Sequence, residues 1–63
     1  MPKPDTDTVH DAYGDTLGKL YANLFEAYMV GHAPDPAADK RFAVGLKLAR
    51  QARDSAITIV SAP

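Results

Sequence analysis

The prolines of this chain leave it only one internal corner. They stand at positions 2, 4, 34, 36 and 63, so residues 5–33 and 37–62 contain none. A proline inside a helix removes a hydrogen bond and clashes with the preceding turn, so long proline-free stretches are where helices form. The segment GHAPDPAADK, residues 31–40, also contains a glycine and two aspartates that suit a turn. The sequence therefore predicts two long elements joined by one corner.

The stretch before the corner has the apolar periodicity of an α-helix. Asp5, Thr6 or Asp7 is expected to cap its start, and Gly31 is expected to end it in the left-handed conformation. We therefore predict a helix over residues 6–30. Its apolar face, at three-and-four spacing, comprises Val9, Tyr13, Leu17, Leu20, Tyr21, Leu24 and Tyr28.

The stretch after the corner predicts a second helix, over residues 36–60. Asp35 is placed to cap it, and Pro36 suits its first turn, where a missing N–H breaks no hydrogen bond. One side of this helix is expected to carry Phe42, Leu46, Ala49, Ala52, Ala56 and Val60.

A turn as short as residues 31–35 favours an antiparallel pair of helices within one domain, residues 1–63. Residues 1–5 and 61–63 are then short tails. Matching positions outward from the corner places Tyr28 near Ala38 and Tyr13 near Arg53.

The length of the chain indicates that such a hairpin needs a partner. A chain of 63 residues buries a small fraction of its surface, and without cysteine it has no disulfide to compensate. Oligomerisation is the common alternative. The expected fold class is therefore all-α: an antiparallel two-helix hairpin that dimerises into a four-helix bundle, most simply as a homodimer. A different protein in place of the second hairpin is the alternative.

The apolar surface of the first predicted helix is wider than one seam, and small residues recur beside it in both helices. Small residues let helix backbones approach closely. We expect the interface within and between hairpins to comprise Tyr13, Gly14, Leu17, Gly18, Tyr21, Ala22, Leu24, Phe25, Tyr28, Met29, Phe42, Gly45, Leu46, Ala49, Ala52 and Ala56.

Two polar residues, His10 and Arg53, fall within the apolar stripes near the open end of the hairpin. The structural interpretation is that Arg53 lays its stem over the end of the core and stacks its guanidinium on Tyr13. The functional interpretation is a polar pocket formed by His10, Arg53, Tyr13 and nearby aspartates. Antiparallel pairing is also expected to bring Arg50 and Arg53 beside aspartates of the first helix, Asp11 and Asp15.

The sequence contains no catalytic constellation. It has no cysteine nucleophile, no glycine-rich phosphate loop and no H-E-x-x-H motif. Its single glutamate, Glu26, is not followed by a histidine three residues later, as di-iron bundles require. We therefore expect a non-enzymatic accessory or regulatory protein, without cofactor or metal, that acts through protein–protein interaction.

Nucleic-acid binding is the main alternative function. Lys40, Lys47 and Arg50 lie on the predicted outer face of the second helix, and a twofold dimer would duplicate them. The expected architecture is similar to that of the Rop family of small RNA-binding hairpin dimers. The resemblance is one of shape, so no site residue is carried over from that family. The formal net charge of −1 argues against nucleic acid as the partner.

The chain is expected to be cytoplasmic and to act away from membranes. Its N-terminal MPKPDTDTVHD is not a basic segment followed by an apolar run, as a secretory signal would be. No stretch approaches the ~18 to 20 apolar residues of a membrane span.

Overall fold

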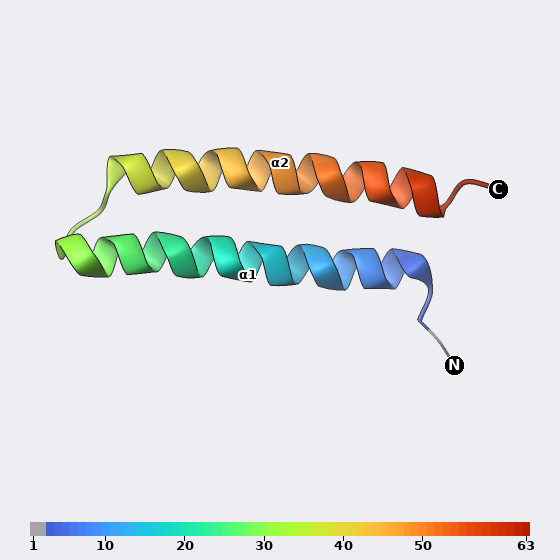
Figure 1. The fold of residues 1–63 in the computed structure, drawn as a ribbon, viewed down its shortest axis with the longest axis horizontal. Coiled ribbons are helices and arrows are strands. Elements are labelled where there is room, and N and C mark those ends of the chain that lie inside the picture. Colours follow the sequence, from blue (N-terminus) through green and yellow to red (C-terminus); the bar gives the residue numbers. More distant parts are fainter. Residues whose placement is uncertain (1–2) are drawn as a thin grey trace.

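The computed structural model describes residues 3–63 as two α-helices joined by a short turn. Helix α1 spans Asp5–Gly31 and helix α2 spans Pro36–Val60. The two run antiparallel and side by side, with both termini at the end away from the turn (Figure 1). No strand occurs in residues 3–63. The prediction of an all-α helical hairpin is confirmed at this level.

The start of α1 differs from the predicted one. Pro4, not an acid or threonine, occupies the N-cap, and its carbonyl accepts from the backbone N–H groups of Asp7 and Thr8 at 3.0 and 3.2 Å. Pro4 has extended backbone, and an N-cap residue needs no N–H of its own in the helix, so proline is tolerated there. Asp5 and Asp7 instead lie in the first turn, where their carboxylates favour the positive end of the helix dipole.

The end of α1 corrects a second prediction. Gly31 is the last helical residue, and His32 takes the left-handed conformation, with φ 54° and ψ 27°. The N–H of His32 donates to the Met29 carbonyl at 3.4 Å, and that of Ala33 donates to the Tyr28 carbonyl at 3.2 Å. This is the Schellman arrangement, moved one residue along the chain. Histidine is enriched in the left-handed region among residues other than glycine, which permits the shift.

The start of α2 is as predicted. The Asp35 carboxylate accepts from the N–H groups of Ala37 and Ala38 at 3.0 and 3.2 Å, and Pro36 occupies the first turn. The turn therefore stops one helix and starts the next within a few residues.

The two helices meet along one seam of half-buried residues with three-and-four spacing, typical of antiparallel helix pairs. Within residues 3–63 only Ala38, with 3% of its surface exposed, is fully buried. The seam comprises Val9, Tyr13, Leu17, Leu20, Leu24, Ala27 and Tyr28 of α1 with Ala38, Phe42, Gly45, Leu46, Ala49, Arg53, Ala56, Ile57 and Val60 of α2.

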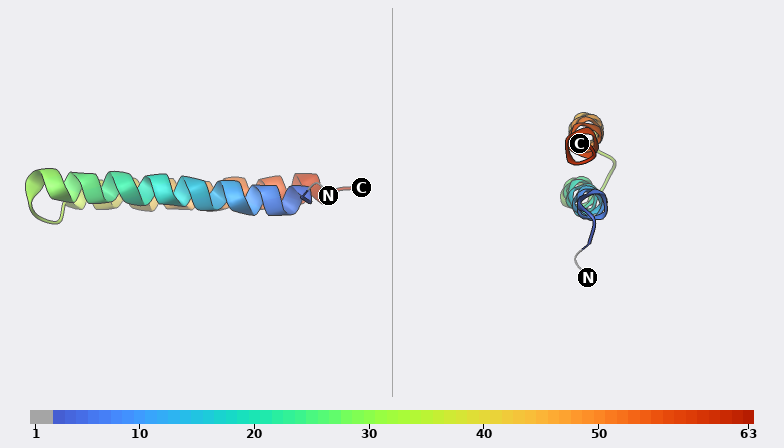
Figure 2. Two further views of the ribbon diagram at one scale, coloured as in Figure 1. Left: turned by 90° about the horizontal axis from the view of Figure 1, so that it is seen from below. Right: turned by 90° about the vertical axis from the view of Figure 1, so that its right-hand side faces the viewer.

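The hairpin is a single layer of helices. Its principal extents are 49 × 23 × 8 Å, and an end-on view shows one helix above the other with no further helix on either side (Figure 2). The Cα radius of gyration is 14.8 Å, against about 11 Å for a compact domain of this length. Because the hairpin has only one layer, both of its broad faces are open, whereas domains are normally built from two or more packed layers.

Candidate association surfaces

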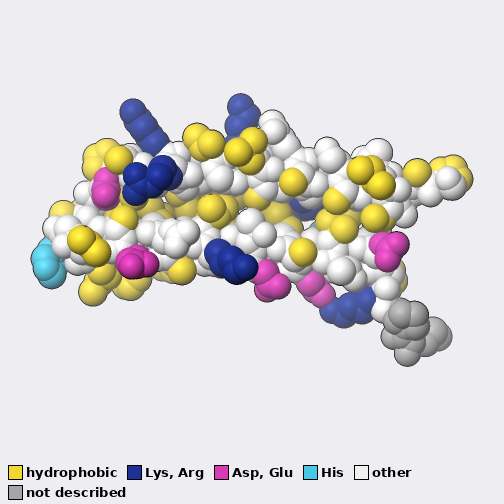
Figure 3. Space-filling view, in the orientation of Figure 1, with side chains coloured by type: hydrophobic (Ala, Val, Ile, Leu, Met, Phe, Trp, Pro, Cys, Tyr) yellow, Lys and Arg dark blue, Asp and Glu magenta, His cyan; other side chains and the backbone are white. Residues whose placement is uncertain are grey.

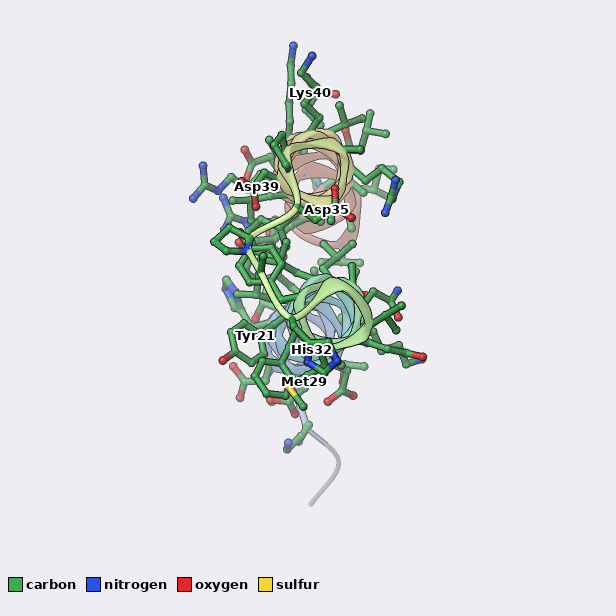
Figure 4. All side chains as sticks on the ribbon, turned by 90° about the vertical axis from the view of Figure 1, so that its left-hand side faces the viewer. Tyr21, Met29, His32, Asp35, Asp39 and Lys40 are labelled. Atoms are coloured by element: carbon green, nitrogen blue, oxygen red, sulfur yellow. The ribbon has the colours of Figure 1, made fainter. Side chains whose placement is uncertain are left out.

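A row of exposed apolar side chains on α1 runs from the first broad face toward the edge of α1 that points away from α2, where Met29 lies (Figure 4). Tyr21, Phe25 and Met29 follow one another at intervals of four residues and are 61%, 53% and 56% exposed. The rings of Tyr21 and Phe25 stack, with centroids 6.4 Å apart and planes inclined by 11°. Tyr21 of α1 and Asp39 of α2 lie on the same side of the hairpin (Figure 4). We call this side the Tyr21 face.

Two glycines belong to the Tyr21 face. Gly14 and Gly18 precede Tyr21 by seven and three residues, so they lie on the same side of α1. A Cβ atom added at either would meet nothing within 4 Å. These glycines are therefore not required for packing within the hairpin, and they lower the helix surface on a side that faces away from α2.

Gly45 has a different role. A Cβ atom at this position would lie 2.7 Å from Cδ2 of Leu20 across the seam. Gly45 therefore lets α1 and α2 approach closely, as the small-residue pattern of the second helix predicted. Ala49 and Ala56 are also half-buried in the seam, whereas Ala52 is exposed.

The second broad face carries apolar residues of α2 that the sequence reasoning missed. Val44, Leu48 and Ile59 are 58%, 58% and 73% exposed. Leu48 follows Asp39 by nine residues, about two and a half turns, so it lies on the side of α2 opposite the Tyr21 face. Figure 3 shows this second side, with hydrophobic atoms over α2, and we call it the Leu48 face. The intervals of four and eleven residues, both close to whole turns, were the available sequence signal.

The predicted interface residues are thus divided between the seam and an open face. The seam contains Tyr13, Leu17, Leu24, Tyr28, Phe42, Gly45, Leu46, Ala49 and Ala56. The exposed remainder comprises Gly14, Gly18, Tyr21, Ala22, Phe25, Met29 and Ala52.

A hollow of about 260 Å³ lies over the seam near the open end. The Arg53 guanidinium carbon lies 4.6 Å from the centre of the Tyr13 ring, and Arg53 Nε donates to Asp54 at 3.0 Å. The stacking of Arg53 on Tyr13 is as predicted. His10 is exposed and does not line the hollow, so the structure does not bring the two residues of the predicted polar pocket together. The lining is mainly small and apolar: Val9, Ala12, Tyr13, Thr16, Ala49, Ala52, Arg53 and Ala56.

The ion pairs also differ from those expected. Asp11 pairs with Lys3, and Arg53 pairs with the neighbouring Asp54, whereas Arg50 and Asp15 form no ion pair with any residue of the described chain. Asp11 and Asp15 lie away from the seam and cannot reach the arginines across it. Because the carboxylate of each observed pair is exposed to solvent, each pair contributes only ~0 to 1 kcal/mol to the free energy of folding.

The residues of the predicted nucleic-acid face do not lie in one strip. Lys40 points away from α1 (Figure 4), and Lys47, two turns further along, lies on the same outer edge. Arg50 follows Asp39 by eleven residues, close to three turns, so it is turned toward the Tyr21 face instead. All three side chains are exposed.

A tyrosine–aspartate hydrogen bond joins the helices near the turn. The Tyr28 hydroxyl donates to Oδ1 of Asp39. This hydrogen bond, with desolvation and the charges of Asp39 and Asp35, raises the pKa of Tyr28 above its ordinary value of 10.0.

Residues 3–63 contain no cluster of three or more metal-ligating side chains. Across the same span, neither helix combines the length and hydropathy needed to cross a membrane. No family model, curated protein or solved structure matches the chain. Its action must therefore be inferred from its own surfaces.

Proposed function

We propose that this protein acts through helix–helix association, as a small non-enzymatic accessory or regulatory subunit whose hairpin forms half of a four-helix bundle. The observation that carries the proposal is the contrast between one buried residue, Ala38, and seven large apolar side chains exposed in residues 3–63. Soluble monomers rarely expose large contiguous apolar patches, and such patches commonly mark interaction sites.

The surface area supports the same proposal. The accessible surface is 4953 Å² for a chain of 6.8 kDa, against about 4,000 Å² for a compact monomer of that mass. Burying a large apolar side chain completely contributes about 1.5–3 kcal/mol. A second layer of helices would supply the burial that one layer lacks.

The test measures solution mass by light scattering together with helix content by circular dichroism, over a wide range of protein concentration. We expect a helical species of twice the chain mass whose helicity and midpoint of thermal unfolding rise with concentration, because association stabilises the folded state by mass action. A poorly helical monomer would indicate that another protein supplies the second layer. A monomer that stays fully helical at every concentration would contradict the proposal.

RNA binding is a second candidate, favoured by the position of Lys40 and Lys47, two turns apart on one exposed outer edge of α2. A twofold dimer would present this edge twice. Binding through phosphate contacts would weaken steeply as salt is raised, and would weaken further on replacing both lysines by glutamate. Binding that responds to neither change would exclude this candidate.

A further inference from the structure

The Tyr21 face is complementary to itself in size. Along one side of α1, the small residues Gly14 and Gly18 come first and the large residues Phe25 and Met29 come last. If a second copy of α1 lies antiparallel on this side, Phe25 falls opposite the partner's Gly18 and Met29 falls opposite the partner's Gly14. In the same register Tyr21 falls opposite the partner's Ala22. Phe25 and Met29 then each meet a low position on the other helix, and Tyr21 lies beside the axis.

We propose that two copies of this chain associate through their Tyr21 faces, about a twofold axis that is perpendicular to the helices and passes beside Tyr21 and Ala22. Helix α1 then packs antiparallel on the partner's α1, and α2 on the partner's α2. The inference rests on the proposed function, because it names the partner and the surface of that association.

Helix α2 provides a separate check through its charges. The contacts Tyr13–Arg53 and Tyr28–Asp39 fix the axial register of α2 against α1. In this register Gly45 of α2 lies close to the proposed twofold axis. Rotation about that axis brings Arg50 opposite the partner's Asp39. Both residues lie on the Tyr21 face, about three turns apart. Opposite charges therefore meet on α2 in the register that α1 requires for size.

Both partners of this charge pair have the capacity to form it. The Arg50 guanidinium forms no hydrogen bond or ion pair with a side chain among residues 3–63. The Asp39 carboxylate accepts from Tyr28 but retains lone pairs for a second donor. Because the arrangement is twofold, every pair forms twice.

The area available is sufficient for a stable dimer. The chain exposes roughly 1,000 Å² more than a compact monomer of its mass. A standard stable interface buries about 800 Å² on each partner. A contact of that size over the Tyr21 face would account for most of the excess and would leave the Leu48 face open.

The size match is tested by Gly18→Leu. A Cβ atom at this position meets nothing within 4 Å in the hairpin, and leucine favours helix more than glycine does, so each hairpin keeps its helices. The leucine occupies the space meant for the partner's Phe25, and we expect the dimer Kd to rise by at least ~10-fold, equivalent to ~1.4 kcal/mol. Gln51→Leu is the matched control, because Gln51 is exposed on the side of α2 opposite the seam. The dimer Kd of this variant should stay unchanged.

The charge match is tested by reversal. Arg50→Asp alone and Asp39→Arg alone each place like charges together and should weaken the dimer, whereas the double variant should recover most of the loss. Because Asp39→Arg also removes the acceptor for the Tyr28 hydroxyl, all of these variants are compared in a Tyr28→Phe background. Arg41→Asp is the control, because Arg41 precedes Leu48 by two turns and lies on the Leu48 face.

The outcomes separate this inference from the proposed function. Two results together support the proposed function and the Tyr21 face: Gly18→Leu weakens the dimer, and the double charge reversal restores the dimer that each single reversal weakens. A dimer that neither set of variants affects overturns the Tyr21 face while leaving association through another surface. A poorly helical monomer overturns the self-pairing and directs the search to another protein. A helical monomer at every concentration overturns both.

Discussion

Two side-chain contacts, one near each end of the seam, set the level of α2 against α1. Arg53 stacks on Tyr13 toward the termini, and Tyr28 donates to Asp39 near the turn. The arginine contact was predictable because a long side chain in an apolar stripe lays its stem over the end of the core, beside the ring of Tyr13 on the facing helix. The Tyr28 contact was expected one residue away, at Ala38, because sequence matching fixes the register of two helices only to about one turn.

Because of the Tyr28 contact, part of the stability of the hairpin is expected to be lost at alkaline pH. The neutral phenol is the form that donates to Asp39, and this raises the pKa of Tyr28 in the folded state above its ordinary value of 10.0. The contribution to stability is therefore complete below that ordinary value and is lost as pH rises through the raised one. We expect Asp39→Asn to lower the pH at which Tyr28 ionises.

The measurement is phenolate absorbance during titration, with Tyr28→Phe subtracted to isolate the one residue. An unchanged Tyr28 titration in Asp39→Asn would show that the hydrogen bond is not formed in solution.

Gly45 is the glycine on which the seam depends. A Cβ atom there lies 2.7 Å from Leu20, so alanine forces the end of that side chain to move while gaining up to ~1 kcal/mol of helix propensity. We expect Gly45→Ala to be near neutral and Gly45→Leu to lower the free energy of unfolding by about 1–3 kcal/mol through overpacking. The measurement is urea unfolding at fixed protein concentration.

Gly31→Leu is the control for Gly45→Leu, because Gly31 is helical, lacks a positive φ and has open space at its Cβ position. Equal effects of leucine at positions 31 and 45 would contradict the close approach at Gly45.

At the scale of the helices, the sequence predicted the start of α2 correctly but misplaced both ends of α1. The start of α2 was predicted correctly because an aspartate followed by a proline combines a side-chain acceptor with a residue suited to the first turn. The end of α1 was not, because Gly31 and His32 both tolerate the left-handed conformation, and one further helical residue decides between them. The N-cap of α1 was also predicted wrongly, because only residues with a side-chain acceptor were considered as caps and Pro4 has none.

The Asp35 cap gives the prediction for α2. Asp35→Ala removes the acceptor for two backbone N–H groups and should lower the free energy of unfolding by about 0.5–2 kcal/mol. Asp35→Asn keeps a side-chain oxygen at the same place and should stay close to the parent protein. Thermal unfolding followed by circular dichroism distinguishes the two variants, and an equal loss in both would mean that charge, not capping, is what Asp35 contributes.

For the whole molecule, the sequence predicted the hairpin and most of the seam, while the further layer of helices stays a prediction. Leu17 and Leu24 enter the seam as the apolar stripe of α1 predicted, and Phe25 and Met29, which are not part of that stripe, stay outside it. Tyr21 was predicted in the same stripe but is 61% exposed, because the packed pair buries a narrower strip of α1 than the stripe covers. On α2 the exposed row from Val44 to Ile59 was hidden because it is interrupted by polar residues. The result is a flat object with an apolar row on each broad face, contributed by a different helix on each side.

This two-sided arrangement predicts which face closes the assembly. Contact between the Tyr21 face of one copy and the Leu48 face of the next would leave an apolar face at each end and would continue to grow, whereas twofold pairing of the Tyr21 faces stops at a dimer. Phe25→Lys and Leu48→Lys form a matched pair, since the parent side chains are 53% and 58% exposed. We expect Phe25→Lys to dissociate the dimer and Leu48→Lys to leave its mass unchanged, as measured by sedimentation over a range of concentrations. Dissociation by Leu48→Lys alone would assign the interface to the Leu48 face, and dissociation by either variant, with growth of the parent protein beyond a dimer, would indicate the head-to-tail arrangement.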